Sequence, residues 1–276
     1  MKLVFSEWKA DYQRYVFPYA VWAIREEGET PADFFELGFL PGSKDLDRFY
    51  LCRNLRIRLS QFEPSSENRR ILRKGRGIEC ELVPREQFEY TPERRSFYKE
   101  YCDIKFGVGV MPWERLDALF SSKLITHLLL FTDQEKGREV GTVTFYLEPP
   151  RVAFYYFAFY DLSYYRRNLG IYMMTRAVLL FQELGYQFLY LGSVYSQNAL
   201  YKTQFKGAEF FNGVEWSRNL KELKYLVRRS EQIWDHHLLE NEEYLRKFHQ
   251  ADLGGLFQKS PFRLSLPSRG KKPKAS

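Results

Sequence analysis

The feature that most constrains the fold is a basic, glycine-containing loop between an apolar strand and an amphipathic helix. Across residues 152–191 the pattern runs strand, loop, helix, strand, and the loop reads Arg166-Arg167-Asn168-Leu169-Gly170. Backbone N–H groups at a helix N-terminus point outward and the helix dipole favours anions, while glycine lets the backbone approach a ligand closely. The sequence therefore predicts a phosphate or pyrophosphate site at this loop; an ordinary loop with a capping glycine is the alternative.

The segments around this unit alternate between strand and helix patterns. A β meander is expected from 127–132, 139–148 and 151–161, and the helix after the loop from about 171–184. The first hundred residues look irregular, with a half-exposed strand at 49–59 whose outer face is basic. The predicted fold class is α+β, a mixed and mostly antiparallel sheet flanked by helices. The other expected elements are helices near 33–37, 65–73, 91–121, 197–206, 219–229 and 231–249, and strands at 188–191 and 208–211.

The composition limits the class of protein. Hydrophobic residues make up 45% of the 276 residues, which excludes disorder for most of the chain, and a net charge of +7 favours a polyanionic partner. Three cysteines without close pairing, a charged N-terminus and no apolar stretch of about 18 residues lead us to expect a cytoplasmic protein without a membrane span. No C-x-x-C pair occurs, and the adjacent His236 and His237 point to different sides of a helix, so we expect no metal site.

The basic loop resembles the (Arg/Gln)-x-x-Gly-x-(Gly/Ala) loop with which GNAT acyltransferases hold the pyrophosphate of acetyl-CoA. Arg167 and Gly170 match it, but Tyr172 replaces the last small residue, and its bulk would crowd acetyl-CoA. A wider match is to the C-terminal domain of arginyl- and leucyl-tRNA–protein transferases, which have a tyrosine at this place. The matching segments, in the same order and with similar spacing, are Phe157-Ala158-Phe159-Tyr160-Asp161, Arg167-Asn168-Leu169-Gly170, Tyr190-Leu191-Gly192 and Tyr201-Lys202-x-x-Phe205.

A block in the N-terminal half also resembles that family. Phe62-Glu63-Pro64-Ser65 followed by Arg69-Arg70 matches the family's F-x-P-S-x-x-x-R-R segment. Many members carry several N-terminal cysteines, including a C-x-x-C pair, whereas Cys52 alone lies in that region here. Leu40-Pro41-Gly42-Ser43 replaces the family's Arg-Ser-Gly pattern. Cluster or metal binding is therefore not carried over to this chain.

The resemblance implies an enzyme of the N-degron type that moves an amino acid, arginine or leucine, from its tRNA ester to a protein N-terminus. Aminoacyl-tRNA would be the donor, a protein or peptide N-terminal amine the acceptor, and no further cofactor is implied. Asp161 would position or deprotonate the amine, while Tyr201 and Lys202 would meet a tRNA phosphate or the oxyanion. The loop residues Arg166, Arg167, Gly170 and Tyr172 would hold the donor, and Arg69, Arg70, Arg73 and Lys74 would contact acceptor-stem phosphates.

Each of these residues also has a structural alternative. Asp161 could be a turn carboxylate, the basic residues could be solvated helix faces, and Tyr160, Tyr172 and Tyr195 could stack the terminal adenosine or pack in the core. Two other functions stay open, an acetyl-CoA-dependent N-acetyltransferase and a non-catalytic relative that binds tRNA or an N-degron. We expect an aminoacyltransferase-type segment at 1–90, a GNAT-like catalytic domain at 91–218, and C-terminal helices with a basic tail at 219–276.

Overall fold

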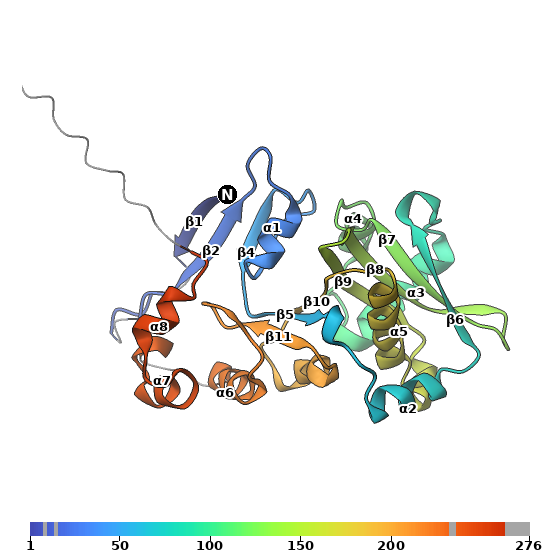
Figure 1. Cartoon of the computed structure of the whole chain (residues 1–276). Coiled ribbons are helices and arrows are strands. Elements are labelled where there is room, and N and C mark those ends of the chain that lie inside the picture. Colours follow the sequence, from blue (N-terminus) through green and yellow to red (C-terminus); the bar gives the residue numbers. More distant parts are fainter. Residues whose placement is uncertain (8–9, 14–15, 232–235, 263–276) are drawn as a thin grey trace, which may run out of the picture.

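The chain folds around two β-sheets of different size (Figure 1). The computed structural model describes residues 1–7, 10–13, 16–231 and 236–262. The larger sheet has the strand order β12-β11-β5-β10-β9-β8-β7-β6 and the smaller one β1-β2-β4-β3. The strands are β1 (Lys2–Glu7), β2 (Tyr19–Ile24), β3 (Phe39–Pro41), β4 (Arg48–Leu51), β5 (Asn54–Arg58), β6 (Ile78–Pro84), β7 (His127–Asp133), β8 (Arg138–Glu148), β9 (Val152–Tyr160), β10 (Phe188–Ser193), β11 (Ala208–Phe211) and β12 (Trp216–Ser217). The α-helices are α1 (Pro31–Glu36), α2 (Ser66–Lys74), α3 (Pro92–Phe106), α4 (Trp113–Phe120), α5 (Leu169–Glu183), α6 (Leu220–Ser230), α7 (Glu242–His249) and α8 (Leu253–Gln258).

The strand–loop–helix–strand unit expected from the sequence lies at the centre of the larger sheet. Strands β7, β8 and β9 form the antiparallel meander, and the 3-10 helix η3 (Leu162–Arg167) and α5 then lead to β10, which runs parallel to β9. Among the described strands this is the only parallel pair. The predicted α+β class, with a mixed and mostly antiparallel sheet flanked by helices, is confirmed.

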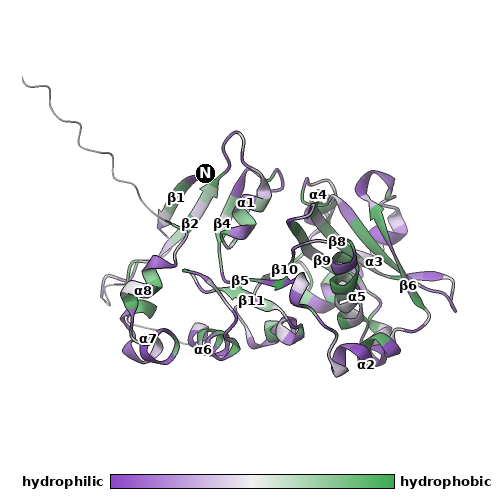
Figure 2. Ribbon diagram, viewed as in Figure 1, coloured by the Kyte–Doolittle hydropathy of each residue, from purple (hydrophilic) through white to green (hydrophobic). Residues whose placement is uncertain are grey.

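Helices cover both faces of the larger sheet because successive strand residues point to opposite sides. In β7, Leu129 packs with Met173 and Phe181 of α5, whereas the adjacent Leu128 packs with residues of α3 and α4 such as Tyr98. Figure 2 shows hydrophobic residues concentrated on β8, β9 and β10. Each large apolar side chain buried in this way contributes about 1.5–3 kcal/mol, so the two helical layers and the sheet form the main core.

The first hundred residues contain more regular structure than the sequence predicted. Strands β1 to β4 form the smaller sheet, and the rings of Phe34 and Phe49 stack 4.2 Å apart between α1 and β4. Phe35 of α1 lies against Phe154 and Tyr190 of the larger sheet, with ring centroids 5.1 and 4.9 Å away. The smaller sheet is therefore packed onto β9 and β10 through a shared aromatic core.

The single strand predicted at 49–59 is wrong. The chain divides there into β4 of the smaller sheet and β5 in the middle of the larger one. Arg56, expected on an exposed basic face, is buried; its Nε lies 2.6 Å from Glu209, and its guanidinium lies 3.8 and 3.7 Å from the rings of Phe188 and Trp216. Strand β5 has no solvent side because β10 and β11 flank it and packing covers it, so its charged side chain needs a buried partner.

Two helix predictions are also corrected. The segment 91–121 forms two helices, α3 and α4, because Gly107 and Gly109 between them adopt φ values of 100° and 86°, which helices cannot contain. The segment 197–206 forms the 3-10 helix η4 (Gln197–Gln204) instead of an α-helix. Both changes place short, irregular backbone near β9 and β10.

The C-terminal region matches the prediction for its first helix, α6. The second predicted helix, 231–249, is described only as η5 (Leu238–Glu240) and α7, since residues 232–235 lie outside the described part of the chain. Strands β5 and β6 belong to the predicted N-terminal segment and pair with strands of the predicted catalytic domain. The segment boundaries themselves remain predictions.

Candidate functional site at the fork of the larger sheet

Strands β9 and β10 pair only along part of their length. Their parallel pairing ends at Phe154 and Tyr190, and β10 then bends at Gly192, whose φ of 77° favours glycine. We call the diverging segments, 155–160 of β9 and 191–193 of β10, the fork. Within the described sheet, the facing backbone edges of the fork have no strand partner, so they can hydrogen-bond a ligand.

A β-bulge in β9 lies beside the fork. Thr144 and Phe145 of β8 pair with Phe157 and Tyr155, so Tyr156 has no partner across that ladder. The Phe157 N–H donates to the Thr144 hydroxyl at 3.0 Å instead. Bulges redirect the neighbouring side chains. Tyr155 accordingly packs with the core under α5, while Tyr156 packs on the opposite face of the sheet.

Helix η4 meets the fork at the end of β10 and carries Tyr201 and Lys202. The ammonium of Lys202 donates to the Ser193 carbonyl at 3.1 Å. Burial lowers the pKa of Lys202 to about 8, and the nearby thiol of Cys52 only partly offsets this effect. No carboxylate among the described residues pairs with this ammonium. Both protonation states of Lys202 are therefore populated near neutral pH, and it can give or accept a proton at the fork.

Tyrosine hydroxyls gather on the β9 side of the fork. They belong to Tyr101 of α3, Tyr155 and Tyr160 of β9 and Tyr201 of η4, and the rings of Tyr101 and Tyr160 lie 4.9 Å apart. Burial, followed by the neighbouring hydroxyls, raises the pKa of Tyr155 and of Tyr101. Tyr201 is half exposed. Tyrosine hydroxyls can donate hydrogen bonds where solvent reaches the group.

Asp161 lies directly after β9, as expected, but its carboxylate is already bound. It accepts the Ser163 N–H at 2.8 Å and the Arg138 guanidinium at 2.6 Å. Burial alone would raise the pKa of Asp161, but these hydrogen bonds outweigh it and the pKa is lowered. A cavity of about 360 Å³ lies beside this ion pair and is also lined by Tyr101 and Tyr160. Asp161 thus borders the fork as an ionised turn carboxylate, which suits positioning of an amine better than removal of its proton.

Arg167 of the basic loop is held by the protein itself. Its guanidinium donates to the carbonyls of Lys74 and Arg76 and lies 3.1 Å from the carboxylate of Asp133. Asp133 is buried, and it also accepts the hydroxyl of Tyr164 at 2.6 Å. The predicted donor-binding side chain therefore fastens α2 to the loop before α5.

Glycine is required at position 170 because the ring of Tyr160 lies directly against its backbone. A Cβ atom at Gly170 would stand 2.8 Å from the ring of Tyr160, closer than real Cβ contacts. The N-terminus of α5 therefore lies directly against the fork. Asn168 precedes the helix with a φ of 55°, and Arg166 beside it is exposed.

The structure brings the basic end of α2 to this same place. Lys74 donates to the carbonyl of Arg166 at 3.1 Å. Arg69 instead binds a carbonyl in its own segment at 2.7 Å, and Arg70 pairs with Glu67. We define the basic patch as the exposed Arg73, Lys74, Arg76 and Arg166. Residues from two separately predicted groups thus form one cationic surface at the N-terminus of α5, and Arg76, which was not predicted, also belongs to it.

The three tyrosines considered for adenosine stacking lie in different environments. Tyr172 is buried, donates to the Ile78 carbonyl at 2.7 Å, and occupies the space that a side chain at Gly75 would need. Its ring therefore packs against α2 and β6. Tyr195 is half exposed and accepts the backbone N–H of Arg53 at 2.8 Å. Tyr160 forms part of the fork.

Tyr101 and Tyr155 were not predicted as site residues from the sequence. No local signal marks them, because the chain holds 20 tyrosines and both stand in ordinary helix and strand patterns. Among the described residues no group of three or more His, Cys, Asp or Glu could hold a metal ion. In the same part of the chain, every helix is too short or too polar to cross a membrane.

Comparison with curated proteins finds relatives of one kind. The aspartate/glutamate leucyltransferase of Pseudomonas aeruginosa (strain UCBPP-PA14) is 26% identical over 195 residues, which cover 67% of this chain and 81% of that protein. The proteins of the same name from Methylobacterium sp. (strain 4-46) and Granulibacter bethesdensis are 27% and 28% identical over 60% of this chain and over 72% and 62% of their own lengths. No family model matches the chain. The resemblance to aminoacyl-tRNA–protein transferases is confirmed by these relatives, which are acyltransferase enzymes.

Solved structures overlap with this chain only in part. One is the C-terminal domain of a putative lysylphosphatidylglycerol synthetase from Agrobacterium fabrum. Its match spans 55% of this chain and 49% of its own, at 15% identity and a TM-score of 0.39. A GCN5-related N-acetyltransferase from Sphaerobacter thermophilus covers 57% of this chain, and 49% of that chain is covered, at 16% identity and a TM-score of 0.34. Scores this low describe a partial overlap and carry no functional argument.

Proposed function

We propose that this relative of the aspartate/glutamate leucyltransferases moves an amino acid from aminoacyl-tRNA to the N-terminal amine of a protein, with the reaction at the fork. The names of the relatives favour leucine as the amino acid and aspartate or glutamate as the accepting residue, with arginine as the second donor to test. One observation carries the proposal. Lys202, in the Tyr-Lys-x-x-Phe motif shared with that family, is a half-buried lysine without a carboxylate partner among the described residues, beside the open strand edges of the fork.

The reaction asks for few groups because the ester is already activated. The acceptor amine loses a proton and attacks the ester carbonyl, which forms an oxyanion. The C–O bond between the carbonyl carbon and the terminal ribose oxygen then breaks. The ribose hydroxyl is the leaving group, and the new amide bond joins the amino acid to the acceptor. Neutral Lys202 accepts the proton from the attacking amine, and the resulting ammonium returns it to the ribose oxygen. Tyr201, which is half exposed, supplies a hydroxyl donor to the developing charge.

The basic patch gives the donor a route to the fork. Lys74 and Arg166 meet at the N-terminus of α5, where backbone N–H groups also favour phosphate. Gly170 brings that helix end against Tyr160 of the fork. A tRNA 3′ end bound through its phosphates at the patch therefore reaches the fork with its ester. We place the activity in the cytoplasm, where charged tRNA is made.

The test is transfer of radiolabelled leucine, and in parallel arginine, from charged tRNA to peptides that begin with Asp, Glu, Arg or Lys. Lys202→Met is expected to reduce transfer by about 100-fold, within the range that a general acid–base contributes. Lys206→Met is the matched control, because Lys206 lies just after η4 and pairs with Glu63 on the surface.

Absence of transfer from every donor to every peptide, by folded protein, would contradict the proposal. Acetylation of the same peptides with acetyl-CoA would then identify an N-acetyltransferase. Binding of charged tRNA and peptide without either reaction would identify a non-catalytic relative.

A further inference from the structure

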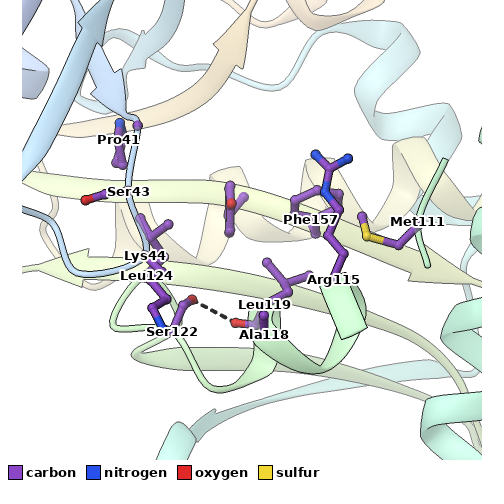
Figure 3. A pocket seen from close by; sticks show the side chains of 12 residues that line it. Pro41, Ser43, Lys44, Met111, Arg115, Ala118, Leu119, Ser122, Leu124 and Phe157 are labelled. Atoms are coloured by element: carbon purple, nitrogen blue, oxygen red, sulfur yellow. Dashed lines mark hydrogen bonds between the residues drawn. The ribbon is translucent and has the colours of Figure 1, made fainter. Parts of the chain in front are cut away.

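A second cavity lies on the opposite face of the sheet from α5, at the bulge of β9 (Figure 3). Its volume is about 220 Å³, smaller than the 300–1,000 Å³ typical of drug-sized ligand sites, so it suits a single side chain. Segment 41–44, between β3 and β4, forms one wall, and α4 with the residues beside it forms another. Tyr156 and Phe157 of β9 also line it, so the cavity begins at the bulge itself.

The lining of this cavity is positive. Lys44 comes from the segment before β4 and Arg115 from α4, and no Asp or Glu lines the cavity. Within the described part of the chain the Arg115 guanidinium donates to the Val110 carbonyl at 3.2 Å, which leaves most of its donors for a ligand. Neither cation pairs with a carboxylate among the described residues. Met111 and Leu119 are buried beneath them, so the cavity combines an apolar base with two cations.

The cavity adjoins the fork along β9. Tyr156 and Phe157 line the cavity and also belong to the fork segment 155–160, beyond the point where β9 pairs with β10. An N-terminal residue whose side chain fills the cavity therefore has its backbone amine beside this segment of β9.

We propose that this cavity binds the acidic side chain of the acceptor's N-terminal residue, with Arg115 and Lys44 as the specificity-determining cations. This inference rests on the proposed function for the statement that the acceptor's amine reacts at the fork. The recognition of an acidic side chain follows from the charge and size of the cavity. Arginine binds a carboxylate through two parallel hydrogen bonds, and a compact lysine adds a second charge. An uncharged amide of the same shape gains neither ion pair, so aspartate is preferred over asparagine.

The experiment compares peptides that begin with Asp and Asn, measured both by transfer and by fluorescence anisotropy of labelled peptide without tRNA. Arg115→Met is expected to lower kcat/KM for the Asp peptide by about tenfold and to leave the Asn peptide nearly unchanged, as expected for loss of one charge-assisted hydrogen bond. Lys44→Met acts in the same direction. The charge reversal Arg115→Glu is expected to favour a peptide that begins with Lys over one that begins with Asp.

Lys123→Met is the matched control, since Lys123 is exposed and donates its backbone N–H to the Lys44 carbonyl at 3.0 Å without lining the cavity. Equal Asp/Asn discrimination in wild type, Arg115→Met and Lys44→Met would overturn the assignment, as would an equal loss in Lys123→Met. The anisotropy keeps the two proposals apart. Arg115-dependent preference for the Asp peptide in protein that transfers nothing supports the cavity and contradicts only the proposed reaction; normal transfer without that dependence contradicts only the cavity.

Discussion

Lys202→Met tests the fork through two quantities that move in opposite directions. Burial keeps the pKa of Lys202 near 8 against an ordinary value of 10.5, so holding the ammonium in the folded protein costs about 3 kcal/mol at 1.36 kcal/mol per pKa unit. Methionine is of similar length and uncharged, so it removes this cost. It also removes the hydrogen bond to the Ser193 carbonyl, which is worth about 1 kcal/mol. The net expectation is a protein more stable by about 2 kcal/mol at pH 7, with transfer reduced by about 100-fold.

The stability difference between wild type and Lys202→Met depends on pH. Well below pH 8 the lysine is protonated in both folded and unfolded chains, and the burial cost is fully present. Between pH 8 and 10.5 the unfolded chain binds more protons than the folded one, so wild-type stability rises with pH relative to the variant. The advantage of methionine therefore shrinks across this window and is largest at and below neutral pH.

Urea denaturation of both proteins at pH 7 and pH 10 measures this difference, and transfer assays at pH 7 run alongside. A gain of about 2 kcal/mol corresponds to a Tm increase of about 4 °C or more for a chain of this size. A Met variant that is less stable at pH 7, or whose advantage grows with pH, would refute the burial argument. A Met variant that transfers at the wild-type rate would refute the role of Lys202 in the reaction.

Three further substitutions test the surroundings of the fork. Arg166→Ala should weaken charged-tRNA binding in a filter assay without lowering the urea midpoint. Arg167→Ala should lower the urea midpoint, because it removes the guanidinium that joins Asp133 to the carbonyls of Lys74 and Arg76; equal stability of the two variants would contradict this division. Gly75→Ala should cost about 2 kcal/mol by calorimetry, since its Cβ would stand 2.1 Å from a buried tyrosine ring, and an unchanged Tm would show that the ring can move. Glu209→Ala should cost about 3–5 kcal/mol in urea, because it leaves the buried arginine of β5 unpaired; a loss below about 1 kcal/mol would argue against that buried charge.

Local sequence patterns were sufficient to predict most of the helices and strands. The apolar alternation predicted the meander of β7, β8 and β9, and its change of period predicted α5. The predicted N-cap residues of two helices were also correct. The side chain of Ser65 accepts a hydrogen bond from the Asn68 N–H at 3.1 Å, and that of Thr91 accepts one from the Arg94 N–H at 3.4 Å. These features depend on residues a few positions apart, so the sequence alone contains what determines them.

The tertiary structure decided which charged side chains are available to a ligand. Arg56 and Arg167 read as exposed cations in the sequence, yet Glu209 and Asp133, both distant along the chain, bind them in the fold. Lys202 read as one residue of a motif, and only its burial against the end of β10 gives it a pKa near neutral. The same holds for the cavity at the bulge, whose two cations come from separate segments. Periodicity and capping are local, whereas burial and charge pairing depend on which distant segments meet, and a single sequence does not specify that directly.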